Sequence, residues 1–281
     1  MFKKNLFILS VLFCFILFSC VPSNKKENSI QIKGSDTMIN LVQAWIEEFM
    51  KQDPKLCISV TGGGSGNGIA SLLNKTCDIA SSSRKIEQEE LEIAKNKQVE
   101  FKEFIVGMDG IVVVIHPSNP IEKLTISQLS DVFTGKITNW KELGGKNAKI
   151  VILSRECNSG TYVYFKEHVL GEGKEYIENT LFLPSSQSIA DEVAQNVNAI
   201  GYYGIGYISP KQKNIAVAKD NNSPFVFPTI ESVKNNSYFI SRPLLMYTNG
   251  EPSGAVKKFI DFILSEQGQK IVEKINFVPI R

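Results

Sequence analysis

The sequence contains few of the residues on which catalysis and metal binding usually depend. It has two histidines and five cysteines among 281 residues, and they show no metal-ligand spacing. The motifs G-x-S-x-G and G-x-x-x-x-G-K-[ST] are absent. His116 and His168 lie at a predicted strand end and in a predicted helix, an arrangement that does not favour a Ser-His-Asp triad. We therefore expect no catalytic residue, no metal and no cofactor.

One local pattern approaches that of a phosphatase. Enzymes of that class hold phosphate under a thiolate in a C-x5-R loop, but six residues separate Cys77 from Arg84. Cys157 lies close to Arg155 before a predicted helix, a setting that would lower the pKa of its thiol. No strong general base is nearby in the sequence, so an enzyme is the less favoured alternative.

The cysteines do not define a disulfide framework. After the first 20 residues three remain, Cys57, Cys77 and Cys157, which is an odd number. A Cys57–Cys77 disulfide and two buried free thiols are both compatible with the sequence, and the buried thiols are the favoured interpretation.

The chain has no excess charge of either sign. Residues 1–19, which we expect to be removed, hold two lysines and no acidic residue, so 29 basic and 29 acidic side chains remain. A neutral chain is not expected to bind nucleic acid through its bulk charge. Any preference for an anion must therefore come from a local site.

The first 20 residues resemble a bacterial lipoprotein signal. Lys3 and Lys4 precede an apolar run at 6–18, which is too short to span a bilayer. The run ends in L-F-S-C, similar to a lipobox in which Cys20 becomes the lipid-modified first residue. We expect residues 1–19 to be the signal peptide and residues 20–29 a flexible tether, with the protein extracytoplasmic and held at a bacterial membrane by this lipid anchor only. A plain signal peptide with an incidental cysteine is the alternative.

The turn after the apolar run at 149–154 is the most informative stretch. Arg155 and Asn158 are followed by Ser159, which is well placed as the N-cap of a helix that begins near Thr161. Free backbone N–H groups and the positive dipole end of such a helix favour an anion. Arg155 adds a full charge and a fork that matches tetrahedral oxyanions. Taken alone, the stretch is equally compatible with an ordinary strand-to-helix turn that carries a surface arginine.

The same arrangement recurs twice nearer the N-terminus. A strand pattern at 30–33 is followed by Gly-Ser-Asp-Thr at 34–37 and a helical pattern. A second strand pattern at 58–61 leads into the glycine-rich stretch 62–68 and another helix. Open α/β sheets build ligand sites at the carboxyl ends of their strands. We therefore predict that three turns converge on one small anion.

Elsewhere the hydrophobic pattern alternates strands and helices. The first helix is expected to bury Leu41, Trp45, Ile46 and Phe49 on one face. Further strands are predicted at residues 77–80, 101–115 with an interruption at 107–110, 199–208 and 242–247, and helices at 87–97, 124–133, 188–197, 253–264 and 267–275. Such alternation implies a mostly parallel sheet with helices on both faces. No repeat of fixed period and no internal transmembrane run is present.

Six short motifs are distributed along the chain after residue 30. They are G-S-D-T at 34–37, G-G-G-S-G-N-G at 62–68, D-I-A-S-S-S-R at 78–84, F-T-G-K-I-T-N-W at 133–140, R-x-x-x-S-G-T at 155–161 and A-I-G-Y at 199–202. Together they resemble the substrate-binding proteins of bacterial phosphate ABC importers. The motifs are specific as a set, and the resemblance extends to the C-terminus.

The resemblance implies a type II periplasmic binding protein, an α/β fold of two lobes, each a mostly parallel sheet flanked by helices, with the ligand in the cleft between them. The chain would cross between the lobes near Asp109 and near Arg242, so that residues 30–108 and 241–281 form lobe 1 and residues 109–240 form lobe 2. Such a protein captures inorganic phosphate as a monomer and delivers it to ABC permease subunits. Alternatives on this fold are a binding protein for sulfate or molybdate and a surface sensor or adhesin.

The resemblance also implies the ligand contacts. Hydroxyl and amide groups would donate to the phosphate oxygens, and an arginine would neutralise charge. Carried over by position, these contacts fall on Ser35, Ser65, Arg155, Ser159, Gly160 and Thr161, with backbone N–H groups near Asp36 and Thr37 in addition.

One position departs from the family pattern. Well-studied phosphate binders place an aspartate after the third strand, where it accepts the proton of HPO4²⁻ and repels sulfate, whereas Ser83 stands here. Asp109 and Asp36 are the candidate replacements, and we favour Asp109 because the crossing strands form the floor of the cleft. Arg84 is predicted either as a second anion clamp paired with Asp109 or as a solvent-exposed residue at a helix start.

Overall fold

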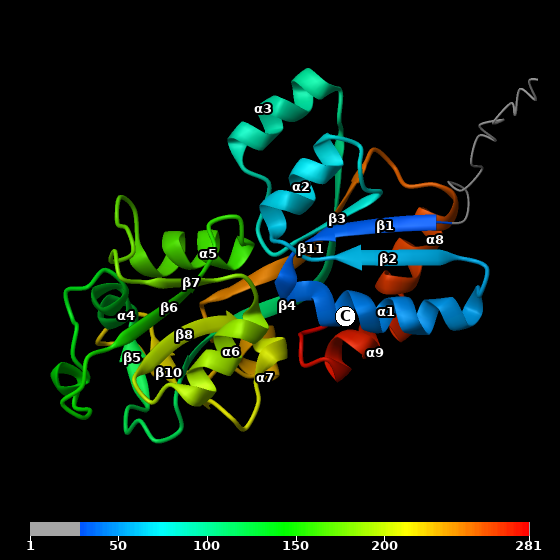
Figure 1. The fold of residues 1–281 in the computed structure, drawn as a ribbon. Coiled ribbons are helices and arrows are strands. Elements are labelled where there is room, and N and C mark those ends of the chain that lie inside the picture. The colour runs from blue at the N-terminus through cyan, green and yellow to red at the C-terminus, as the bar shows by residue number, and fades with distance from the viewer. Residues whose placement is uncertain (1–28, 281) are drawn as a thin grey trace, which may run out of the picture.

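The computed structural model describes residues 29–280, which form two groups of strands and helices joined by a pair of long central strands (Figure 1). The predicted signal peptide, Cys20 and most of the tether lie outside the described residues. Within residues 29–280, no helix is long and apolar enough to cross a membrane. We call the group that contains residues 29–97 the first lobe, and the group that contains residues 116–240 the second lobe.

Three parallel strands form the sheet of the first lobe. They are β1 (Ser29–Gly34), β2 (Cys57–Thr61) and β3 (Ile79–Ser82), in the order β2-β1-β3. The 3-10 turn η1 (Asp36–Met38) leads from β1 into α1 (Ile39–Gln52). One face of the sheet is covered by α1 together with α8 (Gly254–Leu264) and α9 (Glu266–Lys274). The other face is covered by α2 (Ser65–Leu73) and α3 (Gln88–Lys97). The carboxyl ends of the strands point toward the second lobe (Figure 1).

The predicted apolar face of α1 is confirmed, because Leu41, Trp45, Ile46 and Phe49 are all buried. Burial of a large apolar side chain stabilises a fold by about 1.5–3 kcal/mol. Trp45 also donates from Nε1 to the carbonyl oxygen of Gly268 at 2.8 Å. This bond ties the start of α9 to α1, so the C-terminal helices pack on the first lobe.

The second lobe repeats the alternation of strands and helices. Its strands are β5 (Lys123–Thr125), β6 (Val151–Arg155), β7 (Leu181–Leu183), β8 (Ala199–Gly204), β9 (Lys213–Asn214) and β10 (Ala216–Ala218). Its helices are α4 (Ile126–Phe133), α5 (Gly160–Phe165), α6 (Ser186–Gln195) and α7 (Ile230–Lys234), with shorter turns η2 (Trp140–Leu143), η3 (Lys166–Leu170) and η4 (Ile205–Tyr207). β6 pairs in parallel with β7 and β8. The strand predicted at 199–208 is shorter in the structure, because β8 ends at residue 204 and η4 follows it.

Two antiparallel strands connect the lobes, β4 (Phe101–Ile115) and β11 (Ser241–Asn249). Residues 101–110 of β4 pair with β11, and residues 111–115 pair with β8. The interruption predicted at residues 107–110 is wrong, because β4 continues through them. Gly110 lies in the strand because the space beside it is filled, and not because the chain turns there. A Cβ at Gly110 would lie 2.7 Å from Cγ2 of Val233. The predicted α/β class is confirmed, with two central antiparallel strands between the parallel ones.

The cysteines among the described residues are all free thiols. Cys77 is buried, as the favoured interpretation predicts, but Cys57 and Cys157 are exposed. The Cys57–Cys77 disulfide considered above is therefore not formed. Cys57 begins the edge strand β2, where one side of the strand faces solvent.

Candidate functional site

Serine hydroxyls from three turns of the first lobe form a buried cluster. Ser35 follows β1, Ser65 begins α2, and Ser83 follows β3. Oγ of Ser35 donates to Oγ of Ser83 at 3.1 Å, and Oγ of Ser65 lies 3.4 Å from the same oxygen. The backbone N–H of Ser83 also donates to Oγ of Ser65 at 3.0 Å. The predicted convergence of strand ends thus brings these three residues together.

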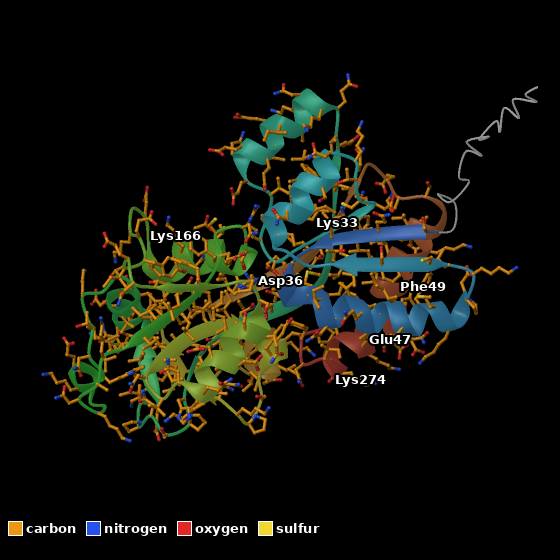
Figure 2. All side chains as sticks on the ribbon, viewed as in Figure 1. Lys33, Asp36, Glu47, Phe49, Lys166 and Lys274 are labelled. Atoms are coloured by element: carbon orange, nitrogen blue, oxygen red, sulfur yellow. The ribbon has the colours of Figure 1, made fainter. Side chains whose placement is uncertain are left out.

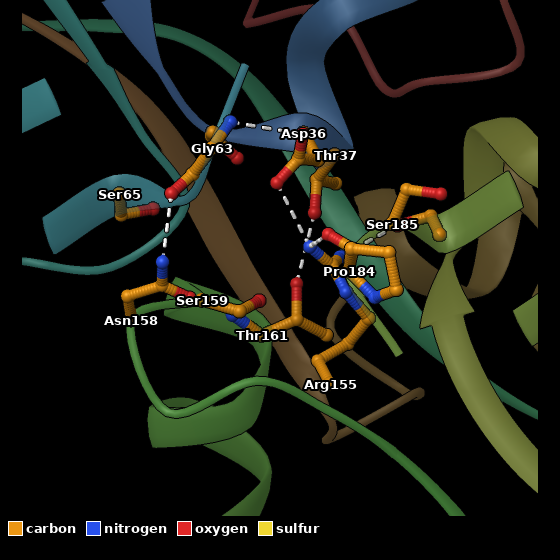
Figure 3. A network of polar contacts seen from close by, with 12 residues as sticks. Asp36, Thr37, Gly63, Ser65, Arg155, Asn158, Ser159, Thr161, Pro184 and Ser185 are labelled. Atoms are coloured by element: carbon orange, nitrogen blue, oxygen red, sulfur yellow. Dashed lines mark hydrogen bonds and ion pairs between the residues drawn. The ribbon is translucent and has the colours of Figure 1, made fainter. Parts of the chain in front are cut away.

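The turn after β6 faces this cluster from the second lobe (Figure 3). The predicted N-cap is confirmed, because Oγ of Ser159 accepts from the N–H of Thr161 at 3.2 Å. Gly160 opens α5 at the point of closest approach. A Cβ on it would lie 2.5 Å from Oγ of Ser65 and 2.8 Å from Oγ of Ser83. Only a glycine lets the start of this helix meet the serine hydroxyls so closely.

A second hydroxyl contact joins the lobes beside the serines. Oγ1 of Thr37 and Oγ1 of Thr161 lie 2.8 Å apart, and both side chains are buried. Asp36 lies where the two lobes meet (Figure 2). The seven predicted hydroxyl and glycine positions thus lie at one interlobe site: Ser35, Thr37, Ser65, Ser83, Ser159, Gly160 and Thr161.

Arg155 is buried at this site, and four of its five N–H groups donate to the protein. Its Nη2 donates to Oδ2 of Asp36 at 2.9 Å and to the carbonyl oxygen of Pro184 at 2.8 Å, and its Nη1 donates to Oγ of Ser186 at 3.1 Å. Burial lowers the pKa of the Arg155 guanidinium, and the Asp36 carboxylate opposes that shift. Asp36 in turn accepts from the N–H of Gly63 at 3.1 Å. The charge of Arg155 is therefore held in one orientation at the carboxyl end of β6.

Arg84 is buried, but its charge is directed toward α3. Nη1 and Nη2 donate to the two carboxylate oxygens of Glu90 at 2.8 and 2.7 Å, and Nε lies 3.2 Å from Oε1 of Glu87. The predicted pairing with Asp109 is wrong, and so is the alternative of a solvent-exposed residue. The reason is local: Glu87 and Glu90 form the capping box of α3, which places Glu90 over Arg84.

Asp109 is fully buried and is held by a residue that was not predicted as part of the site. Its Oδ2 accepts from Nε and Nη2 of Arg242 at 3.1 and 2.9 Å, and its Oδ1 accepts from the N–H of Ile205 at 2.9 Å. Burial raises the pKa of Asp109, and Arg242 opposes that shift. The sequence signal for Arg242 was a single charge within the apolar strand β11, where an unpaired charge is not tolerated.

One further contact between the lobes had no strong sequence signal. Nδ2 of Asn158 donates to the carbonyl oxygen of Gly63 at 2.9 Å (Figure 3). The N–H of Gly66 donates to the carbonyl oxygen of Asn158 at 3.0 Å. These bonds join the turn after β6 to the glycine-rich turn before α2. They close one side of the site.

The arrangement suits the binding of a small oxyanion. Hydroxyl groups, helix-start N–H groups and a buried arginine all supply donors, which a tetrahedral oxyanion accepts. Neither histidine lies among these residues to serve as a base. Within residues 29–280, no group of three or more His, Cys, Asp or Glu side chains could hold a metal ion.

A family model, curated relatives and solved structures all match this chain to the same family. Residues 21–267 match the PBP superfamily domain. The chain is 32% identical to a phosphate-binding protein PstS of Pseudomonas aeruginosa, over 88% of this chain and 81% of that one, and 33% identical to that of Bacillus subtilis, over 99% and 95%. A substrate-binding protein assigned to a phosphate ABC transporter of Clostridium perfringens, solved with bound phosphate, shares 36% identity at a TM-score of 0.82, over 90% of this chain and 100% of that one. The chain therefore belongs to the PBP superfamily and, within it, to the family of phosphate-binding proteins.

Proposed function

We propose that this protein captures inorganic phosphate between its two lobes and delivers it to an ABC permease for uptake. The observation that carries the proposal is the meeting of Ser35, Ser65, Ser83, Gly160 and Thr161 at one buried interlobe site beside Arg155. Relatives over nearly the whole chain are named for phosphate binding, which supports the same ligand.

Binding exchanges hydrogen bonds without any covalent step. Phosphate oxygens accept from the hydroxyls that now bond to one another, such as Ser35 to Ser83 and Thr37 to Thr161. The N–H groups at the start of α5 donate to the same anion, and Arg155 supplies charge. A hinge movement along the two central strands admits and releases the ligand. We place the boundary so that residues 30–108 and 241–281 move as one lobe and residues 109–240 as the other.

A carboxylate is needed to select HPO4²⁻ over sulfate, because only phosphate carries a proton to donate. We assign this role to Asp109, with Asp36 as the second candidate. Both carboxylates are held by arginines, and each has an oxygen that accepts only one bond and keeps an acceptor site. Asp109 is favoured because it is fully buried on the central strand β4, whereas Asp36 is partly exposed. Ser83 lends some support to a second candidate function, the binding of other tetrahedral oxyanions, since a hydroxyl accepts or donates with equal ease.

The remaining assignments concern the setting of the protein. We propose an extracytoplasmic monomer that is anchored through lipid on Cys20 and that docks on permease subunits when closed. The signal-like residues 1–19 support export and anchoring. Relatives named as phosphate-binding proteins support a binding protein rather than an enzyme.

The test is a calorimetric and thermal-shift titration of the purified, ligand-stripped protein with phosphate and with sulfate. We expect saturable phosphate binding and a rise in Tm, because bound ligand increases the free energy of unfolding by RT ln(1 + [L]/Kd), about 2.7 kcal/mol at a hundredfold excess over Kd. An equal response to sulfate would favour the general oxyanion binder. A failure of both anions to bind would overturn the proposal.

A further inference from the structure

We propose that Arg242 is a second anion-binding arginine of this site and that Asp109 positions it. The inference rests on the proposed function and deepens it, because it assigns a further ligand contact. Arg242 lies on β11 between the lobes and is 1% exposed. It contacts Thr161, one of the hydroxyl residues at the anion site, through a bond of 2.8 Å from Nη2 to Oγ1.

The bonds of Arg242 leave one donor without a partner. Nε and Nη2 both donate to Oδ2 of Asp109, at 3.1 and 2.9 Å, and Nη2 also donates to Thr161. Among the described residues, Nη1 has no hydrogen-bond partner although it is buried. Buried charged donors are almost always satisfied, so this atom calls for an acceptor.

The planar geometry of the guanidinium indicates where that acceptor lies. Nε–H and one N–H of Nη2 point to the same side, and both meet Asp109. The other N–H of Nη2 therefore makes the bond to Thr161. In a planar guanidinium one N–H of Nη1 is parallel to this second N–H of Nη2 and points in the same direction. Nη1 is thus directed toward the wall of the site that Thr161 forms, where a phosphate oxygen accepts it.

The neighbouring ring does not satisfy Nη1. Cζ of Arg242 lies 5.6 Å from the centre of the Tyr164 ring, which offsets part of the charge but offers no lone pair. Arg242 also lines an interlobe cavity of 460 Å³, together with Arg84, Tyr164, Glu167 and His168. None of the serine and threonine residues of the anion site lines this cavity, so it lies on the Tyr164 side of the arginine and is separate from the anion site.

Arg242 also sets the direction of the Thr161 hydroxyl. An arginine only donates, so Oγ1 of Thr161 must be the acceptor in their bond. The proton of Thr161 remains free to be given to Thr37 or to the anion. Arg242 thus contributes one direct donor through Nη1 and orients a second through Thr161.

Two replacements of the pair test this role by phosphate calorimetry on the purified protein. Arg242→Lys keeps the charge and loses the fork, while the combined Asp109→Asn and Arg242→Met change removes both charges and leaves no charge buried alone. We expect Kd to rise about 10- to 100-fold in each, the loss of one charged hydrogen bond. Tyr238→Phe is the matched control, because Tyr238 is buried, donates to the carbonyl oxygen of Ile111 on β4 and makes no anion contact.

The charge of the ligand separates direct contact from a purely structural role. Loss of a cation in contact weakens the binding of a dianion more than that of a monoanion. The doubly changed protein and the Asp109→Asn protein differ only in the arginine, so the ratio of their Kd values should be larger at about pH 8.5 than at about pH 5.5. An equal loss at both pH values, or an unchanged Kd in both replacements, would overturn the role of Arg242. Failure of the unchanged protein to bind phosphate would instead overturn the proposed function.

Discussion

Arg155 and Asp36 stand 119 residues apart in the sequence, and Nη2 of the arginine donates to Oδ2 of the aspartate at 2.9 Å. The arginine ends β6 in the second lobe, and the aspartate follows β1 in the first lobe. The pair therefore connects the two lobes at the edge of the hydroxyl cluster. Each residue neutralises the charge of the other, and either charge would be costly to bury without its partner.

Replacement of Arg155 by lysine should abolish tight phosphate binding. Lysine keeps one charge but cannot donate to several acceptors in one plane. We expect Kd to rise about 100-fold or more in calorimetric titrations, because the charged bond to the ligand is lost together with the bonds to Asp36 and Pro184 that hold the guanidinium in place. Lys136→Met removes an exposed charge that pairs with Asp131, and it should leave Kd within about twofold. Similar losses in both variants would show that overall charge, rather than the site, governs binding.

Gly160→Ala should block closure around the ligand without harming the fold. The added Cβ would lie 2.5 Å from Oγ of Ser65 in the closed arrangement. Overpacking of this kind costs about 1–3 kcal/mol in the closed form, so we expect Kd for phosphate to rise about 10- to 100-fold. Tm without ligand should be unchanged, because the ligand-free lobes can open and relieve the contact. The control is Gly66→Ala, whose Cβ would meet its nearest atom at 3.4 Å. Equal phosphate affinity in the two variants would contradict the close approach of α5 to the serines.

Asp109→Asn should weaken phosphate binding and admit sulfate. The buried environment raises the pKa of Asp109, which favours acceptance of a proton from the ligand. An asparagine cannot take that proton, and it repels sulfate less. The measurement is the Kd for sulfate divided by the Kd for phosphate, and this ratio should fall by about tenfold or more. Asp36→Asn tests the second candidate, and a ratio that moved only in this variant would transfer the role to Asp36.

The cysteines provide a prediction that does not depend on the ligand. Burial raises the pKa of Cys77 to about 12, so almost no thiolate is present at about pH 8. An alkylating reagent followed by peptide mass spectrometry should label the exposed Cys57 and Cys157 and spare Cys77 until the protein unfolds. An unfolded cysteine releases its proton near pH 8.5. The contribution of the buried Cys77 thiol to the free energy of unfolding is therefore fully present below that pH and is lost as the pH rises toward 12. Rapid labelling of Cys77 in the folded protein would contradict its burial.

Local chemistry explains why the strand-to-helix turns were predictable from sequence. Ser159 caps α5 through a bond to Thr161 only two residues away, so the pattern of neighbouring residues contains the whole interaction. The pairing of Glu90 with Arg84 was also within reach, because Glu87 and Glu90 have the spacing of a capping box. The serine cluster followed from a general rule about the ends of parallel strands.

The pairs that position the charges were not predictable in the same way. Arg242 and Asp109 are 133 residues apart, and they meet because β4 and β11 pair in antiparallel register at that point. No local pattern predicts that register. Gly110 was misleading for a related reason, since a glycine in a strand resembles a turn until the packing of Val233 against it is known.

The last prediction concerns the hydrogen bond from Asn158 to Gly63. Nδ2 of Asn158 reaches across the cleft to the carbonyl oxygen of Gly63 at 2.9 Å. Because the bond joins the two lobes, we expect it to break when they open. Asn158→Ala should therefore destabilise the closed form by about 0.5–1.5 kcal/mol and raise Kd for phosphate about 2- to 10-fold. The increase should appear mainly in the dissociation rate measured by stopped flow, because closure follows capture.

Asn67 supplies a matched control for this bond, because it donates to the same carbonyl oxygen of Gly63 at 2.6 Å from within the first lobe. Asn67→Ala removes a bond that is present in the open and the closed forms alike. Its effect on the free energy of unfolding should be comparable to that of Asn158→Ala, but the dissociation rate of phosphate should not change. If the two variants released phosphate equally fast, the Asn158 bond would contribute to local turn structure and not to closure of the lobes.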